Sequence, residues 1–81
     1  MDDPVHHPSH YTSGPIECIE ALHSALGPEA FVAFCRGAAI KYCWRAGRKD
    51  DLAQELRKAQ TYLGFALQVL DGRNPLGKEL A

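Results

Sequence analysis

The chain has 81 residues, of which 46% are hydrophobic and 23% are charged, and its formal net charge is −1. This composition is typical of a globular protein, and it argues against a disordered chain and against a generally basic nucleic-acid binder. A domain of this size is marginally stable alone, because it buries a small share of its surface. We expect a single domain over residues 1–81, with an arm (1–14), a helical core (15–72) and a tail (73–81).

The three cysteines, Cys18, Cys35 and Cys43, lie in apolar segments and form no CxxC pair. Their odd number and spacing indicate reduced, buried side chains rather than disulfides or zinc ligands. No apolar run approaches the roughly 18 residues that a membrane span needs, and no signal peptide is expected. We therefore expect a cytoplasmic protein that does not enter the membrane.

The arm has neither helical nor strand periodicity. His6 and His10 are four residues apart, but Pro8 prevents a regular helix between them, so we do not expect a metal site. The arm's polar side chains are either exposed to solvent or folded over a ligand, where histidine could donate to a phosphate or move a proton. The arm residues considered for that contact are His7, Ser9, His10 and Tyr11.

A first helix is predicted for residues 15–26. Pro15 suits the first helical position, Ser13 or Gly14 is expected to cap the helix, and Gly27 ends it. The helix is amphipathic, because apolar residues recur every three or four positions. This stripe consists of Ile16, Ile19, Leu22 and Leu26.

A second helix is predicted to begin at Pro28 and to stop at Gly47, which is expected to be the glycine after the C-cap. Gly37 lies in its interior and leaves a narrow patch where a ligand or another backbone could approach. The side predicted to face the core consists of Phe31, Phe34 or Cys35, Ala38 and Tyr42.

A third helix is predicted from about Asp51 to Leu70, with Asp50 as its N-cap, followed by a frayed polar tail. Its apolar residues cover a face broader than two short helices can bury, which indicates a homo-oligomer interface. The alternative is a core fully closed by three helices. The main stripe consists of Leu52, Leu56, Ala59, Leu63, Ala66 and Leu70.

Positive charge is concentrated in residues 36–49, which contain five basic residues and no acid. Lys41, Arg45 and Arg48 are spaced i, i+4 and i+7, so we expect them to line one helix face suited to a phosphate. The alternative is a solvated helix face, which is weakened because no acid lies three or four residues from Lys41 or Arg45. Trp44 and Tyr42 lie among these cations, where they either stack on a base or belong to the core.

Two pairs of acids, Glu17 with Glu20 and Asp51 with Glu55, are spaced for one face of a helix. Facing carboxylate pairs can hold Mg²⁺ above a nucleoside triphosphate, as all-α pyrophosphatases do with a denser set of acids. The alternative is that these acids cap helices or face solvent. We expect neither a bound metal nor a cofactor, and no phosphate-binding loop is present.

Three segments, "HPSHYTSGPIECIE", "GAAIKYCWRAGRKDD" and "LRKAQTYL", resemble a family of small phage-encoded proteins. One member of that family is known as a nucleotide kinase that lacks a phosphate-binding loop. The resemblance covers about residues 7–67 and implies nucleotide binding within the host cytoplasm. This chain departs from the family pattern at Pro15, which is inserted, and at Ala38, where asparagine is usual.

The resemblance implies that a set of polar and aromatic residues falls on the recurring positions of the family. These are His7, His10, Tyr11, Glu17, Lys41, Tyr42, Arg45, Lys49, Asp51, Lys58 and Tyr62.

We therefore expect an all-α domain of three helices with an irregular N-terminal arm, assembled as a homo-oligomer around a nucleotide or nucleotide-derived molecule. The predicted activity is that of a kinase for (deoxy)nucleoside monophosphates, with His7, His10 and Lys41 as catalytic residues. One alternative is a protein that sequesters a nucleotide signal of host anti-phage defence, and another is a pyrophosphatase-like enzyme. The predicted ligand contacts are His7, Ser9, His10, Tyr11, Lys41, Tyr42, Trp44, Arg45, Arg48 and Lys49.

Overall fold

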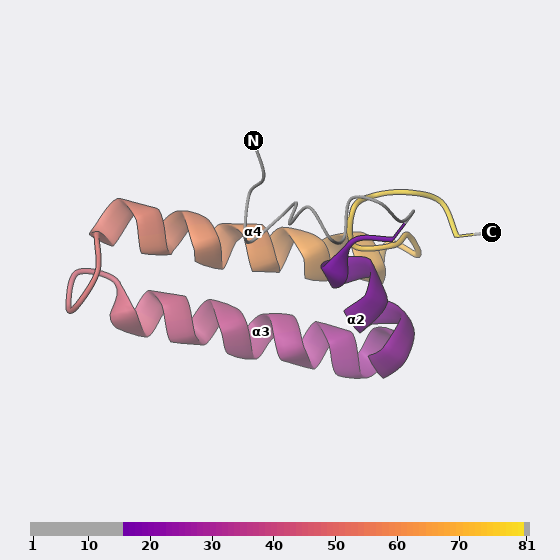
Figure 1. The fold of residues 1–81 in the computed structure, drawn as a ribbon, viewed down its shortest axis with the longest axis horizontal. Coiled ribbons are helices and arrows are strands. Elements are labelled where there is room, and N and C mark those ends of the chain that lie inside the picture. The colour runs from indigo at the N-terminus through magenta and orange to yellow at the C-terminus, as the bar shows by residue number, and fades with distance from the viewer. Residues whose placement is uncertain (1–15, 81) are drawn as a thin grey trace.

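The structure is a computed structural model that describes residues 16–80. It contains three helices, α2 (Cys18–Leu26), α3 (Pro28–Arg45) and α4 (Leu52–Leu70). Helices α3 and α4 lie side by side as a long antiparallel hairpin, and α2 packs at the end opposite the connecting turn (Figure 1). No strand forms within residues 16–80, which confirms the all-helical prediction for that range.

The described helices do not include one with the length and hydrophobicity to span a bilayer. The predicted irregular arm (1–14), which includes the predicted cap residues Ser13 and Gly14, lies outside the described residues.

Helix α2 begins later than predicted. Residues 16 and 17 are not helical, and Glu17 is the N-cap instead of Ser13 or Gly14. The reason is local: the Glu20 carboxylate accepts a hydrogen bond of 3.0 Å from the Glu17 backbone N–H, as in a capping box. The capping box of Glu17 and Glu20 therefore determines where α2 begins, and the prediction that the helix starts at Pro15 is wrong.

The boundaries of α3 and α4 are close to the predictions. Pro28 begins α3, and Gly47 follows the C-cap residue with a φ of 75°, a backbone conformation that suits glycine. Helix α4 is capped one residue later than predicted, because the Asp51 carboxylate accepts from the Gln54 N–H at 2.8 Å. The predicted cap, Asp50, is instead bound by Arg45.

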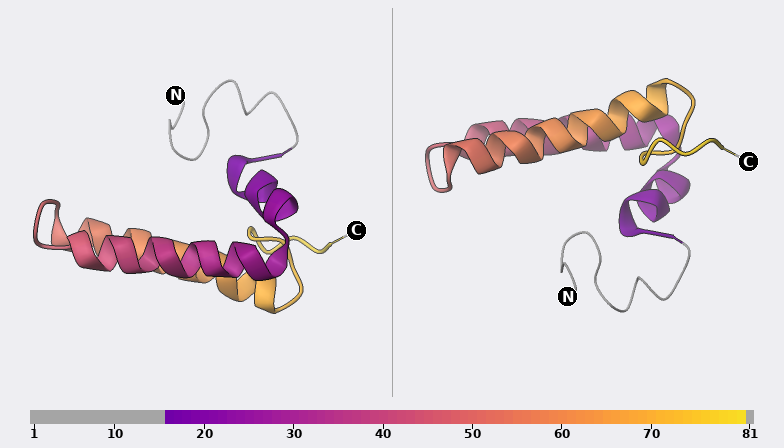
Figure 2. Two further views of the ribbon diagram at one scale, coloured as in Figure 1. Left: turned by 90° about the horizontal axis from the view of Figure 1, so that it is seen from below. Right: turned by 90° about the horizontal axis from the view of Figure 1, so that it is seen from above.

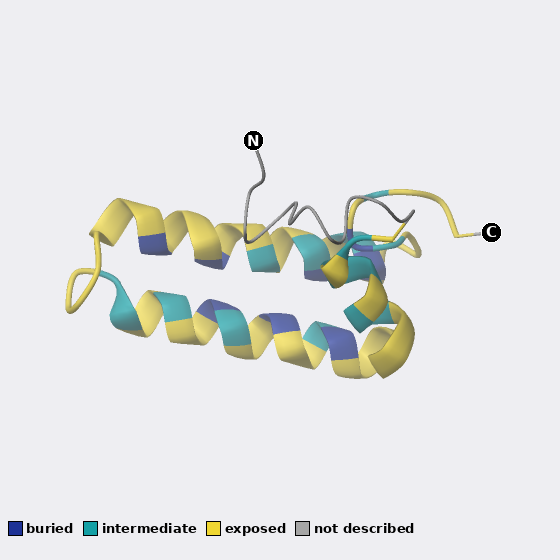
Figure 3. Ribbon diagram, in the orientation of Figure 1, coloured by how far each residue is buried: buried dark blue, intermediate teal, exposed yellow. Residues whose placement is uncertain are grey.

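The core lies between the facing sides of α3 and α4 and under α2 (Figure 3). Phe31 and Cys35 of α3 are fully buried, and Ala66 and Val69 of α4 pack against them. Burial raises the pKa of the Cys35 thiol to about 11, so Cys35 behaves as an apolar side chain. The prediction that all cysteines are buried is wrong, because Cys18 and Cys43 are exposed although free.

The segment after α4 is folded back rather than frayed. Asn74 donates from Nδ2 to Glu20 Oε2 at 2.7 Å, and its own Oδ1 accepts the backbone N–H groups of residues 76 and 78. Pro75 is fully buried. Residues 74–78 therefore form a turn that packs against the start of α2 through Asn74 and Glu20.

Candidate functional site

Charged and aromatic side chains from α3 and α4 meet in the half of the hairpin next to the turn. The Nζ atoms of Lys41 and Lys58 lie 4.5 and 5.5 Å from the centroid of the Tyr42 ring. At these distances a cation is attracted by the ring quadrupole, so two helices hold two ammonium groups against one ring. We call this group the basic cluster, consisting of Lys41, Tyr42, Arg45, Glu55, Lys58 and Tyr62.

Glu55 is the buried centre of the basic cluster, with only 1% of its surface exposed. Its Oε2 atom lies 2.9 Å from Lys58 Nζ, and its Oε1 atom lies 3.6 Å from Arg45 Nε. The second distance is too long for a hydrogen bond, so Oε1 has no hydrogen-bond partner among the described residues. A buried carboxylate needs cations beside it, and Glu55 therefore fixes Arg45 and Lys58 next to each other.

Arg45 and Lys58 both remain charged in this environment. Arg45 donates to Asp50 Oδ2 from Nη2 at 2.6 Å and from Nε at 3.2 Å. These hydrogen bonds to Asp50, helped by the charge of Glu55, raise the pKa of Arg45. The hydrogen bond to Glu55 raises the pKa of Lys58. Both acidic partners of Arg45 lie outside the spacing of three or four residues, since Asp50 and Glu55 follow five and ten residues further along the chain.

The two tyrosine rings of the basic cluster pack together beside its cations. The rings of Tyr42 and Tyr62 are stacked, with centroids 5.7 Å apart and an interplanar angle of 25°. Tyr62 also meets Phe34 and Phe65 edge to face. Burial raises the pKa of Tyr62. This packing resolves the ambiguity about Tyr42, which is half-buried against α4 rather than free to stack on a base with both faces.

The basic cluster carries an excess of positive charge. It holds three cations and one buried acid, and the additional acid, Asp50, is exposed at its edge. Lys41 makes no ion pair with any of the described residues, so its three donors are available to an anion. One turn earlier, Gly37 has no atom within 4 Å of the position a Cβ would take, which leaves open space beside Lys41.

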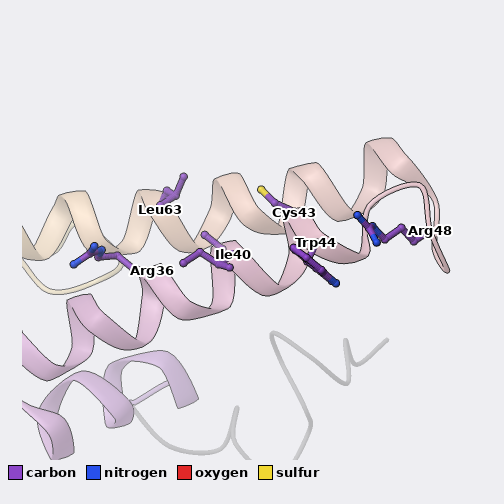
Figure 4. Close-up of a pocket in the computed structure, with 7 residues that line it drawn as sticks. Arg36, Ile40, Cys43, Trp44, Arg48 and Leu63 are labelled. Carbon is purple, nitrogen blue, oxygen red and sulfur yellow. The ribbon is translucent and has the colours of Figure 1, made fainter.

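Arg48 and Trp44 lie on the other flank of the hairpin. Helix α3 ends at Arg45, so the predicted row of three cations is interrupted, and the Arg48 guanidinium lies 4.6 Å over the Trp44 ring. Trp44 is 67% exposed, which excludes the core interpretation for this residue. Both line an open groove of about 510 Å³ (Figure 4), together with Arg36, Ala39, Ile40, Cys43 and Leu63.

The remaining predicted ligand contacts are Lys49, which belongs to neither the basic cluster nor the groove, and the four arm residues. Lys49 is exposed in the turn after α3, where its backbone N–H donates to the Arg45 carbonyl at 3.4 Å. The four arm residues lie outside the described range, so their predicted contacts with a ligand stay predictions. These are His7, Ser9, His10 and Tyr11.

The two acid pairs do not face each other. Glu20 binds Asn74 just beyond the C-terminal end of α4, whereas Asp51 caps its N-terminal end. The 19 residues of α4 separate the pairs by roughly 28 Å, at about 1.5 Å per residue. Residues 16–80 also contain no group of three or more His, Cys, Asp or Glu side chains that could hold a metal ion. The geometry of this range gives the pyrophosphatase-like alternative no support.

Three members of the basic cluster are not among the predicted ligand contacts. Lys58 and Tyr62 were marked only by the "KAQTYL" motif, and Glu55 was interpreted as one of a pair of magnesium ligands. The helical period of α4 places Glu55, Ala59 and Tyr62 on the side that faces α3. An acid on that buried side, opposite an arginine, was the available signal for an internal ion pair.

Two phage proteins are similar to this chain. The gene 1.7 protein of Enterobacteria phage T3 is 40% identical over 62 residues, which are 72% of this chain and 38% of the relative. The nucleotide kinase gp1.7 of Escherichia phage T7 is 41% identical over 59 residues, which are 68% of this chain and 30% of the relative. The matched region therefore spans only about a third of the length of these relatives.

No solved structure matches this chain. The model of one protein family, described as a protein of unknown function (DUF3310), matches residues 5–64 and thus includes the basic cluster. Because this match covers most of the sequence, the chain belongs to the DUF3310 family.

Proposed function

We propose that the chain binds the phosphate of a nucleotide at the basic cluster and transfers a phosphoryl group to a (deoxy)nucleoside monophosphate. The observation that carries this proposal is the convergence of Lys41, Arg45 and Lys58, from two helices, on one aromatic ring and one buried carboxylate. Cations held in place before a ligand arrives stabilise negative charge without further reorganisation. The name of the T7 relative, nucleotide kinase, supports the same chemistry.

The proposed step moves the terminal phosphoryl group of a nucleoside triphosphate. Its bond to the β-phosphate oxygen breaks, a new bond forms to a phosphate oxygen of the monophosphate, and two diphosphates result. Phosphoryl transfer depends mainly on positioning and on neutralising the charge of the equatorial oxygens. Lys41 would contribute a mobile point charge, while Glu55 keeps Arg45 and Lys58 in fixed positions.

Lys41→Gln is the sharpest test, because Lys41 has no ion pair within the described range and its loss leaves the internal ion pairs intact. We expect nucleotide binding, measured by titration calorimetry, to weaken roughly 10- to 100-fold, the value of one charge-assisted hydrogen bond. Arg36→Gln is the matched control, because it removes one positive charge from the same helix on the groove flank. We expect this variant to bind as the wild type does.

Incubation with nucleoside mono- and triphosphates, followed by chromatography of the nucleotides, tests the transfer itself. New diphosphates that disappear in Lys41→Gln support the proposal. Unchanged nucleotides released only after denaturation would overturn the transfer and favour sequestration instead. A wild-type protein that binds no nucleotide, or equal losses in both variants, would remove the basic cluster from the proposal.

A further inference from the structure

The stripe of apolar residues on α4 is divided according to size. Its alanines, Ala59 and Ala66, are only 3% and 5% exposed and fill the contact with α3. The large residues beside them point away from that contact and are 45–67% exposed, namely Leu52, Leu56, Leu63, Leu67 and Leu70. Within this stripe, the small side chains pack against α3, and the large ones are left without a partner within the described chain. The alternative of a closed three-helix core is therefore wrong for this range.

The exposed leucines continue across the hairpin onto α3. Ile40 is 66% exposed and Trp44 is 67% exposed, and both line the same groove as Leu63. Figure 4 shows Leu63 on α4 and Ile40 and Trp44 on α3 around this groove, with α2 clear of it. Helix α2 projects to one side of the hairpin in both views of Figure 2, and none of its residues lines the groove. We call the seven residues the leucine face: Leu52, Leu56, Leu63, Leu67, Leu70, Ile40 and Trp44.

The leucine face is large enough for a stable contact between proteins. At roughly 100 Å² or more for each large apolar side chain, the exposed fractions leave on the order of 500 Å² of apolar surface. A standard interface buries about 800 Å² on each partner, of which roughly 60% is apolar. The apolar area available therefore matches what one side of such an interface requires.

We propose that the leucine face binds the same face of a second copy of this chain. A two-fold contact joins identical patches, and a patch without charged residues along its α4 stripe is complementary to itself. If the two α4 helices are antiparallel, Arg48 at the turn of one copy lies near Asp71 at the end of α4 of the other. Asp71 is 68% exposed and only loosely paired with Arg73, at 3.9 Å, so it remains available to that arginine.

The sole tryptophan of the chain, Trp44, lies within the leucine face and reports on whether the face is covered. Sedimentation should give a mass of at least twice 8.9 kDa, with Trp44 emission blue-shifted and shielded from iodide. Dilution below the dissociation constant should lower the mass and shift the emission to the red together. This readout needs no substitution and is independent of nucleotide binding.

Leu67→Glu places a charge at a residue that is 61% exposed and outside the intramolecular core, so the helical circular dichroism signal should be unchanged. We expect self-association to weaken by about 100-fold or more, because the two-fold axis buries the charge twice. Leu80→Glu is the matched control, because Leu80 is 57% exposed but lies in the segment after α4. We expect this variant to associate as the wild type does.

Three outcomes would overturn the proposal. A monomeric wild type with exposed Trp44 would assign the leucine face to a different protein. A monomeric wild type with shielded Trp44 would mean that another part of the same chain covers the face. Association that survives Leu67→Glu but not Leu80→Glu would place the contact elsewhere.

Discussion

The two flanks of the α3–α4 hairpin are built from interleaved residues of the same helices but are completed differently. On one flank, Arg45 and Lys58 find their partner in buried Glu55, and the aromatic rings of Tyr42 and Tyr62 stack within the chain. On the other flank, the leucine face finds no covering element within residues 16–80. We therefore propose a small charged ligand for the first flank and a protein surface for the second.

This difference shows how side-chain size directs an amphipathic helix. Alanines at the contact between α3 and α4 let the two helices approach closely, since interaxial distances depend on the side chains between them. The broad apolar face of α4 then exceeds what α3 can cover. A chain of 81 residues thus has a narrow core of its own and an exposed apolar surface, which we propose a second copy buries.

The largest effect on stability should come from placing a large side chain where α4 has a small, buried one. Ala66→Leu inserts a large side chain into the packed contact with α3, and we expect the free energy of unfolding to fall by about 1–3 kcal/mol. Chemical denaturation at a fixed protein concentration measures this change. The neighbouring substitution Leu67→Ala should leave the helical fold intact and weaken self-association only. Similar losses of fold stability in both variants would contradict the division into an inner and an outer row.

On the flank that carries the basic cluster, we expect Glu55→Gln to lower the free energy of unfolding by about 1–2 kcal/mol, because a buried charge-assisted hydrogen bond to Lys58 is lost. Nucleotide binding should weaken as well, since Arg45 and Lys58 are no longer held together. Asp50→Asn removes the exposed partner of the same arginine and is the matched control. Because exposed ion pairs contribute little, we expect a smaller change, below about 1 kcal/mol.

If both Asp50→Asn and Glu55→Gln left nucleotide binding unchanged while wild-type binding was clear, Glu55 would have only a structural role. If Asp50→Asn had the larger effect on binding, the exposed ion pair would be the one that positions Arg45.

The smallest effect should come from the end of the hairpin that belongs to neither flank. The hydrogen bond from the Glu17 backbone, with smaller contributions from Lys78 and Asn74, lowers the pKa of Glu20. The unfolded chain therefore takes up a proton at Glu20 before the folded one does, at about the ordinary pKa of 4.5. The stability contributed by Glu20 is present above that pH and is lost as the pH falls through the folded-state pKa.

Thermal melts between neutral and acidic pH should show this loss in the wild type and a flatter profile in Glu20→Gln. We expect Lys78→Ala to change the profile less, because the lysine makes only a secondary contribution to the pKa of Glu20. Self-association through the leucine face should not differ between the two variants. An unchanged acid profile in Glu20→Gln would contradict the role of Glu20 at the start of α2.

The sequence predicted the helices well because their boundaries are local. Pro28 and Gly47 frame α3 through their own backbone preferences, and the period of α4 defines its apolar stripe. The start of α2 was misplaced because it depends on a hydrogen bond to Glu20. The turn after α4 was missed because Asn74 binds a residue 54 positions earlier.

The candidate site could be predicted only in part, for a related reason. The spacing of Lys41 and Arg45 marks one helix face, but it does not show which residues of α4 lie opposite. That depends on how α3 and α4 pack, which brings Glu55 and Lys58 to Arg45 and Tyr42. The same packing separates Arg48 and Trp44 from the other predicted contacts and assigns them to the groove.

The separation of the two flanks is tested most directly by nuclear magnetic resonance during titration with a deoxynucleoside monophosphate. We expect the signals of Tyr42, Lys58 and Tyr62 to shift as the nucleotide binds, while the methyl signals of Leu63 and Leu67 stay in place. Shifts confined to the leucine methyls and the Trp44 indole would contradict the assignment of the nucleotide to the basic cluster.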